Sequence, residues 1–299
     1  MGNINKPPFD DALTPWDLWY KDLEPQQLGN IYKIQRVLYS GESEYQRIDV
    51  FEHGWLGRML VLYGAVMMTE RDEFIYHEMI THPALFVHPD PRRVLVIGGG
   101  DGCTLREVLR HPSVTLARQV EIDGQVVEVA REWLSEVNGN SFDDPRVDLV
   151  IDDANTFLDG DDGTYDVVLS DCSDPLGPAE VLFEKDFFEK VLDRLGDHGI
   201  FAAQTESPMF YPDQVREIHR RLHQVFPVVR MYLAHIPTYP GAMYSFAFCS
   251  RGLDPVGDFH HERVSDLGLE TKYYNADLHG SCFVLPTCAR ELTCERPTD

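Results

Sequence analysis

The sequence has few basic residues for its length. Its 299 residues include 26 lysines and arginines but 50 aspartates and glutamates, which gives a formal net charge of −24. Nucleic acids and anionic membrane surfaces would be repelled by such a chain, so we expect neither as a partner. An amine or polycation fits the charge, although an acidic, highly soluble protein without such a ligand is the simpler interpretation of composition alone.

Cysteine clusters and long apolar runs are also missing. The six cysteines show no C-x-x-C spacing and no histidine pair stands at metal-ligand spacing, so we expect reduced thiols and no metal site. No apolar run approaches the ~18 residues of a membrane-spanning helix. The N-terminus, Met-Gly-Asn-Ile-Asn-Lys-Pro-Pro, lacks the apolar segment of a signal peptide. These absences favour a cytoplasmic protein.

A glycine loop directly after an apolar run is the central feature of the sequence. Val94-Leu95-Val96-Ile97 leads into Gly98-Gly99-Gly100-Asp101-Gly102, and a helical pattern follows. A buried strand, a tight turn and a helix start bring backbone N–H groups close to a ligand. The spacing is G-x-G-x-G, whereas the dinucleotide fingerprint G-x-G-x-x-G would need a glycine in place of Cys103. A helix entry turn without a ligand remains the alternative.

The hydrophobic period changes near residue 70 and divides the chain into two predicted domains. Residues 1–70 contain short alternating segments separated by turns such as Ser40-Gly41, which predict a small antiparallel β-domain with an N-terminal aromatic arm around Trp16. Residues 71–299 form the second predicted domain. It begins with a helix that should stop by His82-Pro83, because proline disfavours helical backbone before it.

Strand and helix patterns alternate through the second predicted domain. The predicted strands lie at 94–98, 116–121, 147–151, 166–170, 199–204, 228–234 and 243–249. The predicted helices lie at 104–110, 124–134, 155–158, 184–195 and 212–225. This alternation predicts an α/β fold with a doubly wound, Rossmann-like parallel sheet. The remaining segment, 253–299, is expected to be irregular and to pack back on the sheet.

Acidic residues follow the predicted strands at the points where the strands end, at Asp101, Glu121, Asp153 and Asp171. Ligands of open parallel sheets lie outside these carboxyl ends, and a carboxylate about 20 residues after the glycine loop accepts hydrogen bonds from ribose hydroxyls. No lysine or arginine cluster accompanies the acids, so a cationic sulfonium fits better than a phosphate-bearing dinucleotide. Helix capping and solvated turn acids are the structural alternatives.

Motifs from residue 45 to residue 241 occur in the order found in one enzyme family. They are Tyr45-Gln46, Thr69 to Glu78, Gly98 to Gly102, Val120 to Asp123, Asp171 to Pro178, Gln204 to Pro208 and Ile236 to Gly241. With these motifs the chain resembles the spermidine synthases, a family of polyamine aminopropyltransferases. The resemblance implies a small N-terminal β-domain before a methyltransferase-type Rossmann-like domain, and homodimers or homotetramers.

The resemblance also implies a reaction and its residues. Family members transfer an aminopropyl group from the co-substrate decarboxylated S-adenosylmethionine to putrescine, giving spermidine and 5′-methylthioadenosine, with no prosthetic group. Asp171 falls at the position of the general base. Positions that contact the nucleoside or its aminopropyl group are Gln46, His77, Asp101, Glu121, Asp153, Ala154 and Pro178. Positions that hold the diamine are Tyr76, Asp174, Tyr239 and Glu206.

Some residues depart from the family pattern. Tyr63 replaces the aspartate of a usual Leu-Asp-Gly turn, Met67 replaces a usual glutamine, and Cys103 replaces glycine or alanine. Two further departures are Ala154-Asn155, where glycine is usual after the adenine-binding aspartate, and Ala242, where a second glycine is usual. None removes a catalytic group. Because of Met67 and Ala242, cadaverine, agmatine and spermidine remain alternatives to putrescine as the acceptor.

The implied chemistry requires a base stronger than an ordinary carboxylate. The attacking amine is protonated at neutral pH, with a pKa of about 10, whereas a typical aspartate has a pKa of about 4. We expect repulsion from Asp174 and partial burial to raise the pKa of Asp171. Two alternative functions remain: an amine N-methyltransferase that uses S-adenosylmethionine on the same fold, and a catalytically silent binding paralogue.

Overall fold

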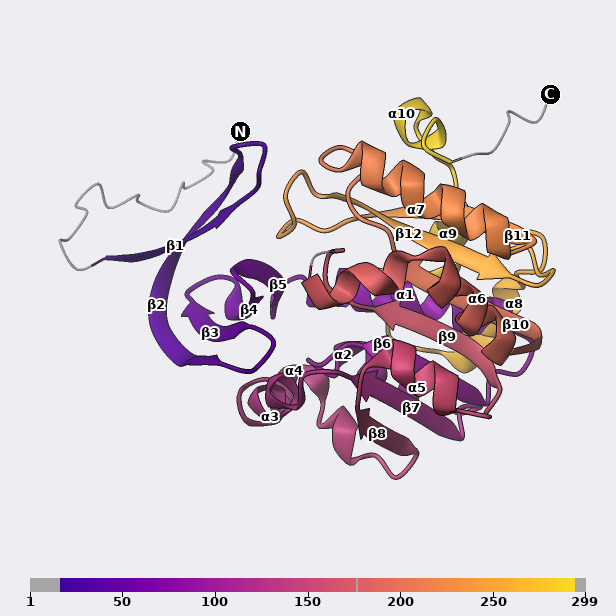
Figure 1. The fold of residues 1–299 in the computed structure, drawn as a ribbon, viewed down its shortest axis with the longest axis horizontal. Coiled ribbons are helices and arrows are strands. Elements are labelled where there is room, and N and C mark those ends of the chain that lie inside the picture. The colour runs from indigo at the N-terminus through magenta and orange to yellow at the C-terminus, as the bar shows by residue number, and fades with distance from the viewer. Residues whose placement is uncertain (1–16, 176, 294–299) are drawn as a thin grey trace.

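Two β-sheets organise the computed structural model, which describes residues 17–175 and 177–293 (Figure 1). The smaller sheet is antiparallel, in the order β1 (Leu18–Leu23), β2 (Gly29–Glu42), β3 (Arg47–His53), β4 (Gly57–Leu62) and β5 (Ala65–Thr69). The predicted N-terminal β-sheet is thus confirmed. Trp16 of the predicted arm lies outside the described residues. The turn expected at Ser40-Gly41 is wrong, because β2 continues to Glu42 and the chain turns at Ser43, whose hydroxyl accepts from the Gln46 N–H at 3.0 Å.

The larger sheet has seven strands in the order β11-β12-β10-β9-β6-β7-β8. These strands are β6 (Arg93–Gly98), β7 (Leu116–Glu121), β8 (Val147–Ile151), β9 (Tyr165–Asp171), β10 (Leu195–Gln204), β11 (Val228–His235) and β12 (Met243–Ser250). Strands β6 to β10 pair in parallel, and β12 and β11 add antiparallel strands at one edge. The predicted Rossmann-like α/β fold is therefore confirmed.

Helices cover both faces of the larger sheet. Val94 and Val96 of β6 belong to a core shared with α1 (Glu73–Val87), α2 (Cys103–Leu109) and α3 (Gly124–Trp133). Leu95 and Ile97 belong to the opposite core, with α5 (Ala154–Gly160), α6 (Lys185–Arg194) and α7 (Pro212–Val225). A strand covered on both faces needs apolar side chains at every position, which explains the uninterrupted run before the glycine loop.

Shorter helices complete the chain. They are α4 (Ser135–Asn138), α8 (His261–Leu267), α9 (Ala276–Cys282), α10 (Thr287–Arg290) and the 3-10 helices η1 (Ser141–Asp143) and η2 (Gly177–Phe183). The segment after residue 253 contains the three short helices α8, α9 and α10 rather than being irregular throughout, and it packs back on the sheet as expected, with Tyr274 and Cys282 in the shared core. Asn275 caps α9 by accepting the Leu278 N–H at 2.8 Å. Within the described ranges, no helix has the length and apolar character needed to cross a membrane.

The order of the strands creates a switch point between β6 and β9. The chain moves from β6 to β7 and β8 on one side, and then places β9 and β10 on the other. Ligands of open α/β sheets bind outside the carboxyl ends of the strands at such a point. The glycine loop after β6 and Asp171 at the end of β9 lie there.

The N-terminal sheet contacts the larger one near this edge. Asn30 Nδ2 and Tyr32 Oη from β2 donate to the Thr238 carbonyl at 3.1 and 3.3 Å, and Gln26 Nε2 donates to the Phe210 carbonyl at 2.8 Å. Both acceptors lie in loops that follow strands of the larger sheet. The β1–β2 hairpin, which is the long curved ribbon of Figure 1, is therefore fixed to the loops beside the switch point.

Helix α1 does not stop at His82-Pro83 but continues to Val87 with Pro83 inside it. Proline has no N–H, so the carbonyl of Met79 one turn earlier lacks its helical donor. The buried Tyr232 hydroxyl of β11 donates to that carbonyl at 2.9 Å. A tertiary hydrogen bond thus replaces the one that proline removes, and the sequence prediction failed because it considered only local backbone preference.

Removing this hydroxyl by Tyr232→Phe should lower the free energy of unfolding by about 1–3 kcal/mol, because the Met79 carbonyl becomes an unpaired buried acceptor. In a Pro83→Ala background the backbone N–H of position 83 can donate to the same carbonyl, so Tyr232→Phe should cost less. Urea denaturation of the wild type, both single variants and the double variant measures this coupling. Equal costs in the two backgrounds would show that Tyr232 does not compensate for Pro83.

Candidate active site

A cavity of about 730 Å³ lies between the N-terminal sheet and the switch point. Its wall contains the side chains predicted from the sequence, namely Gln46, Tyr76, His77, Asp101, Glu121, Asp153, Ala154, Asp171, Asp174, Glu206 and Tyr239. Pro178 lies in η2, and its side chain is not described. No lysine or arginine is among the described residues of the wall, whereas acids come from several strand ends. The cavity is therefore suited to a cation.

The glycine loop brings β6 and β9 into close contact. The Gly99 N–H donates to the Asp171 carbonyl at 2.7 Å. Gly98 has a φ of +76°, and a Cβ at this position would lie 2.3 Å from the Asp171 carbonyl oxygen. Only glycine avoids this collision and adopts the left-handed conformation without strain. The loop sequence thus permits the backbone contact that places Asp171 beside Asp101.

Glu121 occupies the end of β7 with its carboxylate buried. Its Oε1 accepts the Asp123 N–H at 2.9 Å. Burial raises the pKa of Glu121 to about 7, and the charges of Asp123, Asp171 and Asp101 add to this increase. A ligand with hydroxyl donors would stabilise the charged form of this carboxylate.

The N-terminal sheet and α5 complete this end of the cavity. Gln46, in the turn after β2, donates through Nε2 to Asp123 Oδ2 at 3.1 Å. Asp153 caps α5 by accepting the Thr156 N–H at 2.9 Å, and Ala154 is the first residue of that helix. The capping contacts fix the position of the Asp153 carboxylate, which also lines the cavity.

Asp171 and Asp101 are half-buried in the cavity wall. Asp171 Oδ2 has no hydrogen-bond partner among the described residues. Burial and the charge of Asp101 raise the pKa of Asp171, while His77, Thr104 and Tyr76 oppose the increase. The predicted direction of the shift and the contribution of burial are confirmed, but the acid expected to repel Asp171 is corrected. The main repelling acid is Asp101 rather than Asp174, because the ends of β6 and β9 are adjacent.

His77 lies between two carboxylates. Its Nδ1 is 2.8 Å from Glu73 Oε2, and its Nε2 is 3.5 Å from Asp101 Oδ2. Burial alone would lower the pKa of His77, but Asp101 and Glu73 together raise it well above the ordinary value. Asp101 Oδ1 also accepts the Cys103 N–H at 2.7 Å, and the pKa of Asp101 is lowered despite its burial because of His77 and this N–H. These contacts favour an imidazolium at His77 and a carboxylate at Asp101.

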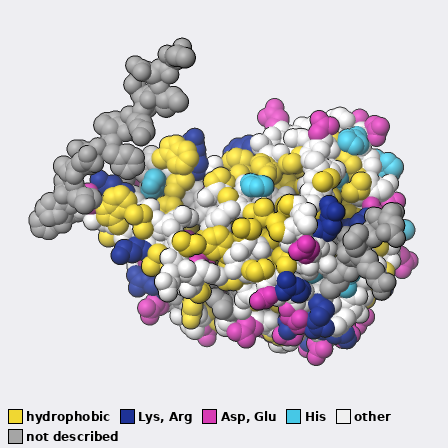
Figure 2. Space-filling model, turned by 90° about the horizontal axis from the view of Figure 1, so that it is seen from above, with side chains coloured by type: hydrophobic (Ala, Val, Ile, Leu, Met, Phe, Trp, Pro, Cys, Tyr) yellow, Lys and Arg dark blue, Asp and Glu magenta, His cyan; other side chains and the backbone are white. Residues whose placement is uncertain are grey.

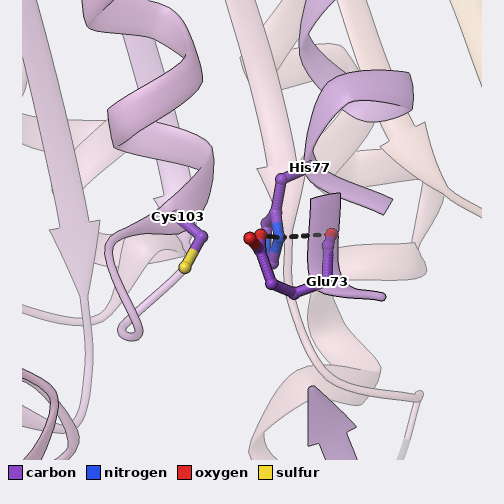
Figure 3. A group of neighbouring side chains, drawn as sticks. All are labelled: Glu73, His77 and Cys103. Carbon is purple, nitrogen blue, oxygen red and sulfur yellow. Dashed lines mark hydrogen bonds and ion pairs between the residues drawn. The ribbon is translucent and has the colours of Figure 1, made fainter. Parts of the chain in front are cut away.

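Glu73, His77 and Cys103 are close enough to hold a metal ion, with potential ligand atoms within 4.8 Å of one another (Figure 3). Two observations argue against this use. Both oxygens of Glu73 already accept hydrogen bonds from Arg106, at 3.0 and 2.9 Å. Burial and the neighbouring Asp101 raise the pKa of the Cys103 thiol well above its usual value, whereas a metal needs the thiolate. The group is better suited to retaining a proton on His77.

The opposite end of the cavity combines tyrosines with a second acidic pair. The rings of Tyr76 and Tyr239 have centroids 6.0 Å apart, and Tyr239 Oη donates to the Met67 carbonyl at 2.8 Å. Burial and the nearby Asp174 raise the pKa of Glu206 well above its usual value. Glu206 also has a φ of +72°, a strained conformation for a residue other than glycine. Aromatic faces beside acids provide a channel for an alkylammonium ion.

Sequence analysis missed some residues of this end, namely Asp22, Glu24, Tyr211 and Tyr244, which also line the cavity. Burial raises the pKa of Asp22 to about 6, with smaller contributions from Glu24 and Asp174. Tyr211 donates a hydrogen bond to the Glu24 carboxylate. A signal lies in β1, where Tyr20 and Asp22 are two positions apart and so point to the same face, but the sequence alone does not show that this strand reaches the site.

Two family models together match most of the chain. Residues 73–256 match the family model described as the spermine/spermidine synthase domain, and residues 18–70 match the one described as the spermidine synthase tetramerisation domain. The polyamine aminopropyltransferase of Bacillus subtilis (strain 168) is 41% identical over 276 residues, which are 92% of this chain and 99% of that protein. The polyamine aminopropyltransferase of Thermotoga petrophila is 42% identical over 286 residues, 95% of this chain and 96% of that protein.

Two solved structures have the same fold as this chain. A spermidine synthase in complex with the transition-state analogue AdoDATO superposes with a TM-score of 0.90 at 42% identity, covering 92% of this chain and 94% of that one. The spermidine synthase of Thermotoga maritima superposes with a TM-score of 0.87 at 41% identity, covering 92% of this chain and 93% of that one.

Proposed function

The chain is a polyamine aminopropyltransferase of the spermidine synthase family, and on this premise we propose that it transfers the aminopropyl group of decarboxylated S-adenosylmethionine to putrescine. The products are spermidine and 5′-methylthioadenosine. The observation that carries the proposal is the buried Asp171 Oδ2, which lacks a hydrogen-bond partner among the described residues and lies in a cavity wall rich in acids. Such an oxygen is suited to accept the proton of an incoming amine.

The nucleoside of the co-substrate occupies the end of the cavity near β7 and α5 in this proposal. The two oxygens of Glu121 accept hydrogen bonds from the ribose hydroxyls, since a carboxylate can accept from both. Asp153 and Ala154 contact the adenine, and Gln46 and Pro178 complete the nucleoside contacts. No lysine or arginine lines the described part of the wall, which fits a sulfonium compound without phosphates.

Asp101 holds the primary ammonium of the aminopropyl group, with His77 beside it. Intact S-adenosylmethionine carries an additional carboxylate on the corresponding carbon. That carboxylate would lie near Asp101 and Asp171, where it would be repelled and would find no lysine or arginine in the described wall. The same acids that bind the decarboxylated compound thus select against its precursor.

Asp171 acts as the general base for the transfer. It takes a proton from the attacking amine, whose lone pair forms a bond to the methylene carbon beside the sulfonium. The carbon–sulfur bond breaks, and its electron pair neutralises the sulfur of 5′-methylthioadenosine. The stem of the diamine lies against Tyr76 and Tyr239, and its far ammonium is bound by Asp174 and Glu206.

The enzyme acts as a homo-oligomer, a dimer or a tetramer, in the cytoplasm. Two observations support an assembly through the N-terminal sheet. The relevant family model is described as a tetramerisation domain, and large hydrophobic side chains are exposed on this sheet and its turns, including Leu18, Trp19, Ile31, Val37 and Trp55. Figure 2 shows hydrophobic side chains on this part of the molecule and across the middle of the same face, while acidic side chains lie mostly around the periphery.

The proposal is tested by incubating the purified protein with putrescine and decarboxylated S-adenosylmethionine. We expect stoichiometric spermidine and 5′-methylthioadenosine by mass spectrometry. Intact S-adenosylmethionine should give no S-adenosylhomocysteine, which a methyltransferase would release, and a silent paralogue would give no product from either compound. Cadaverine, agmatine and spermidine in parallel reactions should be used less well than putrescine.

The Asp171→Asn variant should lose at least about 100-fold in kcat, because an amide cannot accept the proton and general-base catalysis contributes factors of this size. Its affinity for 5′-methylthioadenosine should be unchanged, as measured by calorimetry, because Asp171 contacts the reacting amine rather than the nucleoside. Asp186→Asn, at an exposed position of α6, is the matched control and should retain full activity. Wild-type turnover in Asp171→Asn would refute the assignment of the base.

The pH dependence follows from the direction of the Asp171 shift. Its raised pKa means that the base loses its charge, and activity falls, at a higher pH than for an ordinary aspartate. The acceptor amine is protonated below a pKa of about 10, so the deprotonated nucleophile becomes more abundant as the pH rises. The value of kcat/KM should therefore increase between about pH 6 and pH 9, with an optimum above neutrality. A flat profile over this range would contradict both assignments.

A further inference from the structure

Four side chains of alternating charge form a row that begins outside the described cavity wall and ends within it. Arg106 donates through Nη1 and Nη2 to the two oxygens of Glu73, at 3.0 and 2.9 Å. Glu73 Oε2 lies 2.8 Å from His77 Nδ1, and His77 Nε2 lies 3.5 Å from Asp101 Oδ2. Figure 3 shows the link between Glu73 and His77, which lie on the same side of α1. Each charge in the row has a neighbour of opposite sign.

The outer end of this row is held firmly. Arg106 also donates to the Val137 carbonyl at 2.6 Å and through Nε to Glu107 Oε1 at 2.8 Å. Glu107 is itself buried and accepts from Arg110 at 2.7 Å and contacts His82 Nε2 at 3.1 Å. The guanidinium therefore has a fixed position on α2, and it fixes the Glu73 carboxylate in turn.

His77 lies among charged and titratable groups from α1, α2, the loop after β6 and the end of β9. These groups are Glu73 and Tyr76 on α1, Asp101 on the loop, Cys103 and Arg106 on α2, and Asp171 on β9. Asp171 in turn is near Asp101, Tyr76, Thr104, Tyr239 and Glu121. His77 is the cation that faces both reaction-centre acids, Asp101 and Asp171, and the Glu73 carboxylate stabilises its charge.

We propose that Glu73 and Arg106 are positioning residues that keep His77 charged, so that Asp101 and Asp171 are both ionised when the amines bind. The inference rests on the proposed function, because it assigns a purpose to the ionised state of these acids. Neither Glu73 nor Arg106 belongs to the cavity wall as described, so both act through His77 rather than on a substrate.

The physical reason is the proximity of the two half-buried acids Asp101 and Asp171. Two carboxylates that share a low-dielectric site compete for one proton unless a cation compensates their charge. Protonation of Asp101 would remove the partner of the aminopropyl ammonium. Protonation of Asp171 would remove the base. If His77 lost its proton, one of these two failures would follow at neutral pH, and a more alkaline solution would reverse it.

The first test compares the pH dependence of kcat/KM in the wild type, Glu73→Gln and Arg106→Gln. An opposite charge nearby shifts a carboxylate pKa by about 1–3 units. The acidic limb of the kcat/KM profile should therefore move to higher pH by about one unit in both variants. Their activity should then fall about tenfold at pH 7 and approach that of the wild type at pH 9. A loss by the same factor at every pH would indicate a merely structural role and would overturn the proposal.

Arg110→Gln is the matched control on α2. It removes a guanidinium that donates to Glu107 and to the Glu270 carbonyl, and among the described contacts none joins Arg110 to Glu73, His77 or Asp101. Its acidic limb should coincide with that of the wild type. An upward shift equal to that of Arg106→Gln would attribute the effect to general loss of positive charge and would overturn the specific role of Arg106.

Binding measurements separate this inference from the proposed function. Decarboxylated S-adenosylmethionine carries the ammonium that Asp101 binds, and 5′-methylthioadenosine does not. At pH 7, Glu73→Gln should leave the affinity for 5′-methylthioadenosine unchanged. If Asp101 is the acid that takes the proton, the affinity for decarboxylated S-adenosylmethionine should fall about tenfold. If Asp171 takes the proton, that affinity is kept and only kcat falls. Unchanged affinity together with unchanged kcat would overturn the inference. A wild type that formed no spermidine and 5′-methylthioadenosine would instead refute the proposed function.

A measurement on the wild type tests the proposal even where a variant fails to fold. Nitrogen-15 NMR of histidine-labelled enzyme at about pH 8.5 should show an imidazole with protons on both nitrogens, because His77 retains its charge at a pH where an ordinary histidine is neutral. The complete absence of an imidazolium signal at this pH would overturn the proposal without any variant.

Discussion

The active site depends on one close approach between two backbones. Where β6 ends beside β9, the Gly99 N–H donates to the Asp171 carbonyl at 2.7 Å. The same carbonyl lies so close to Gly98 that a side chain at position 98 would collide with it. This contact brings the loop that carries Asp101 next to the strand end that carries Asp171. The two acids are thus adjacent because the sheet changes direction here, although 70 positions separate them along the chain. The glycine loop therefore builds the reaction centre as well as a possible nucleoside contact.

Burying several acids in one wall creates an electrostatic problem that the structure solves in two ways. An uncompensated buried carboxylate is costly, so it is either paired with a cation or protonated. Asp101 has His77 as a cationic partner and its pKa is lowered. Glu206 has the acid Asp174 beside it, and its pKa is raised. The charge of one acidic site is therefore compensated by a cation of the protein, whereas the pKa of the other is raised by a neighbouring acid.

The sequence predicted the main elements and the acids of the cavity wall at strand ends from local signals, and resemblance to the family supplied the other predicted wall residues. Strands and helices follow from hydrophobic period, and the acids of the wall stand directly at strand ends. What it could not predict depends on contacts between distant segments. Pro83 remains within a helix because Tyr232 supplies a donor from β11. Asp22 reaches the cavity because the β1–β2 hairpin is fixed to distant loops. In the sequence, Glu73 and Arg106 look like ordinary helix charges, and only the fold places them in one row with His77.

The different states of the two acidic sites suit the two cations of the proposed reaction. The aminopropyl ammonium must stay charged and in place during transfer, and Asp101, already ionised, can hold it without any change of protonation. The diamine must enter as a dication and give up one proton before it attacks. The pKa of Glu206 is raised beside Asp174, and a bound far ammonium would lower it again, because the ammonium compensates both acids. The near ammonium lies next to the ionised Asp171, which takes its proton as the base, whereas the far ammonium is held by two acids. The arrangement therefore favours loss of the proton from the amine that reacts rather than from the one that anchors the substrate.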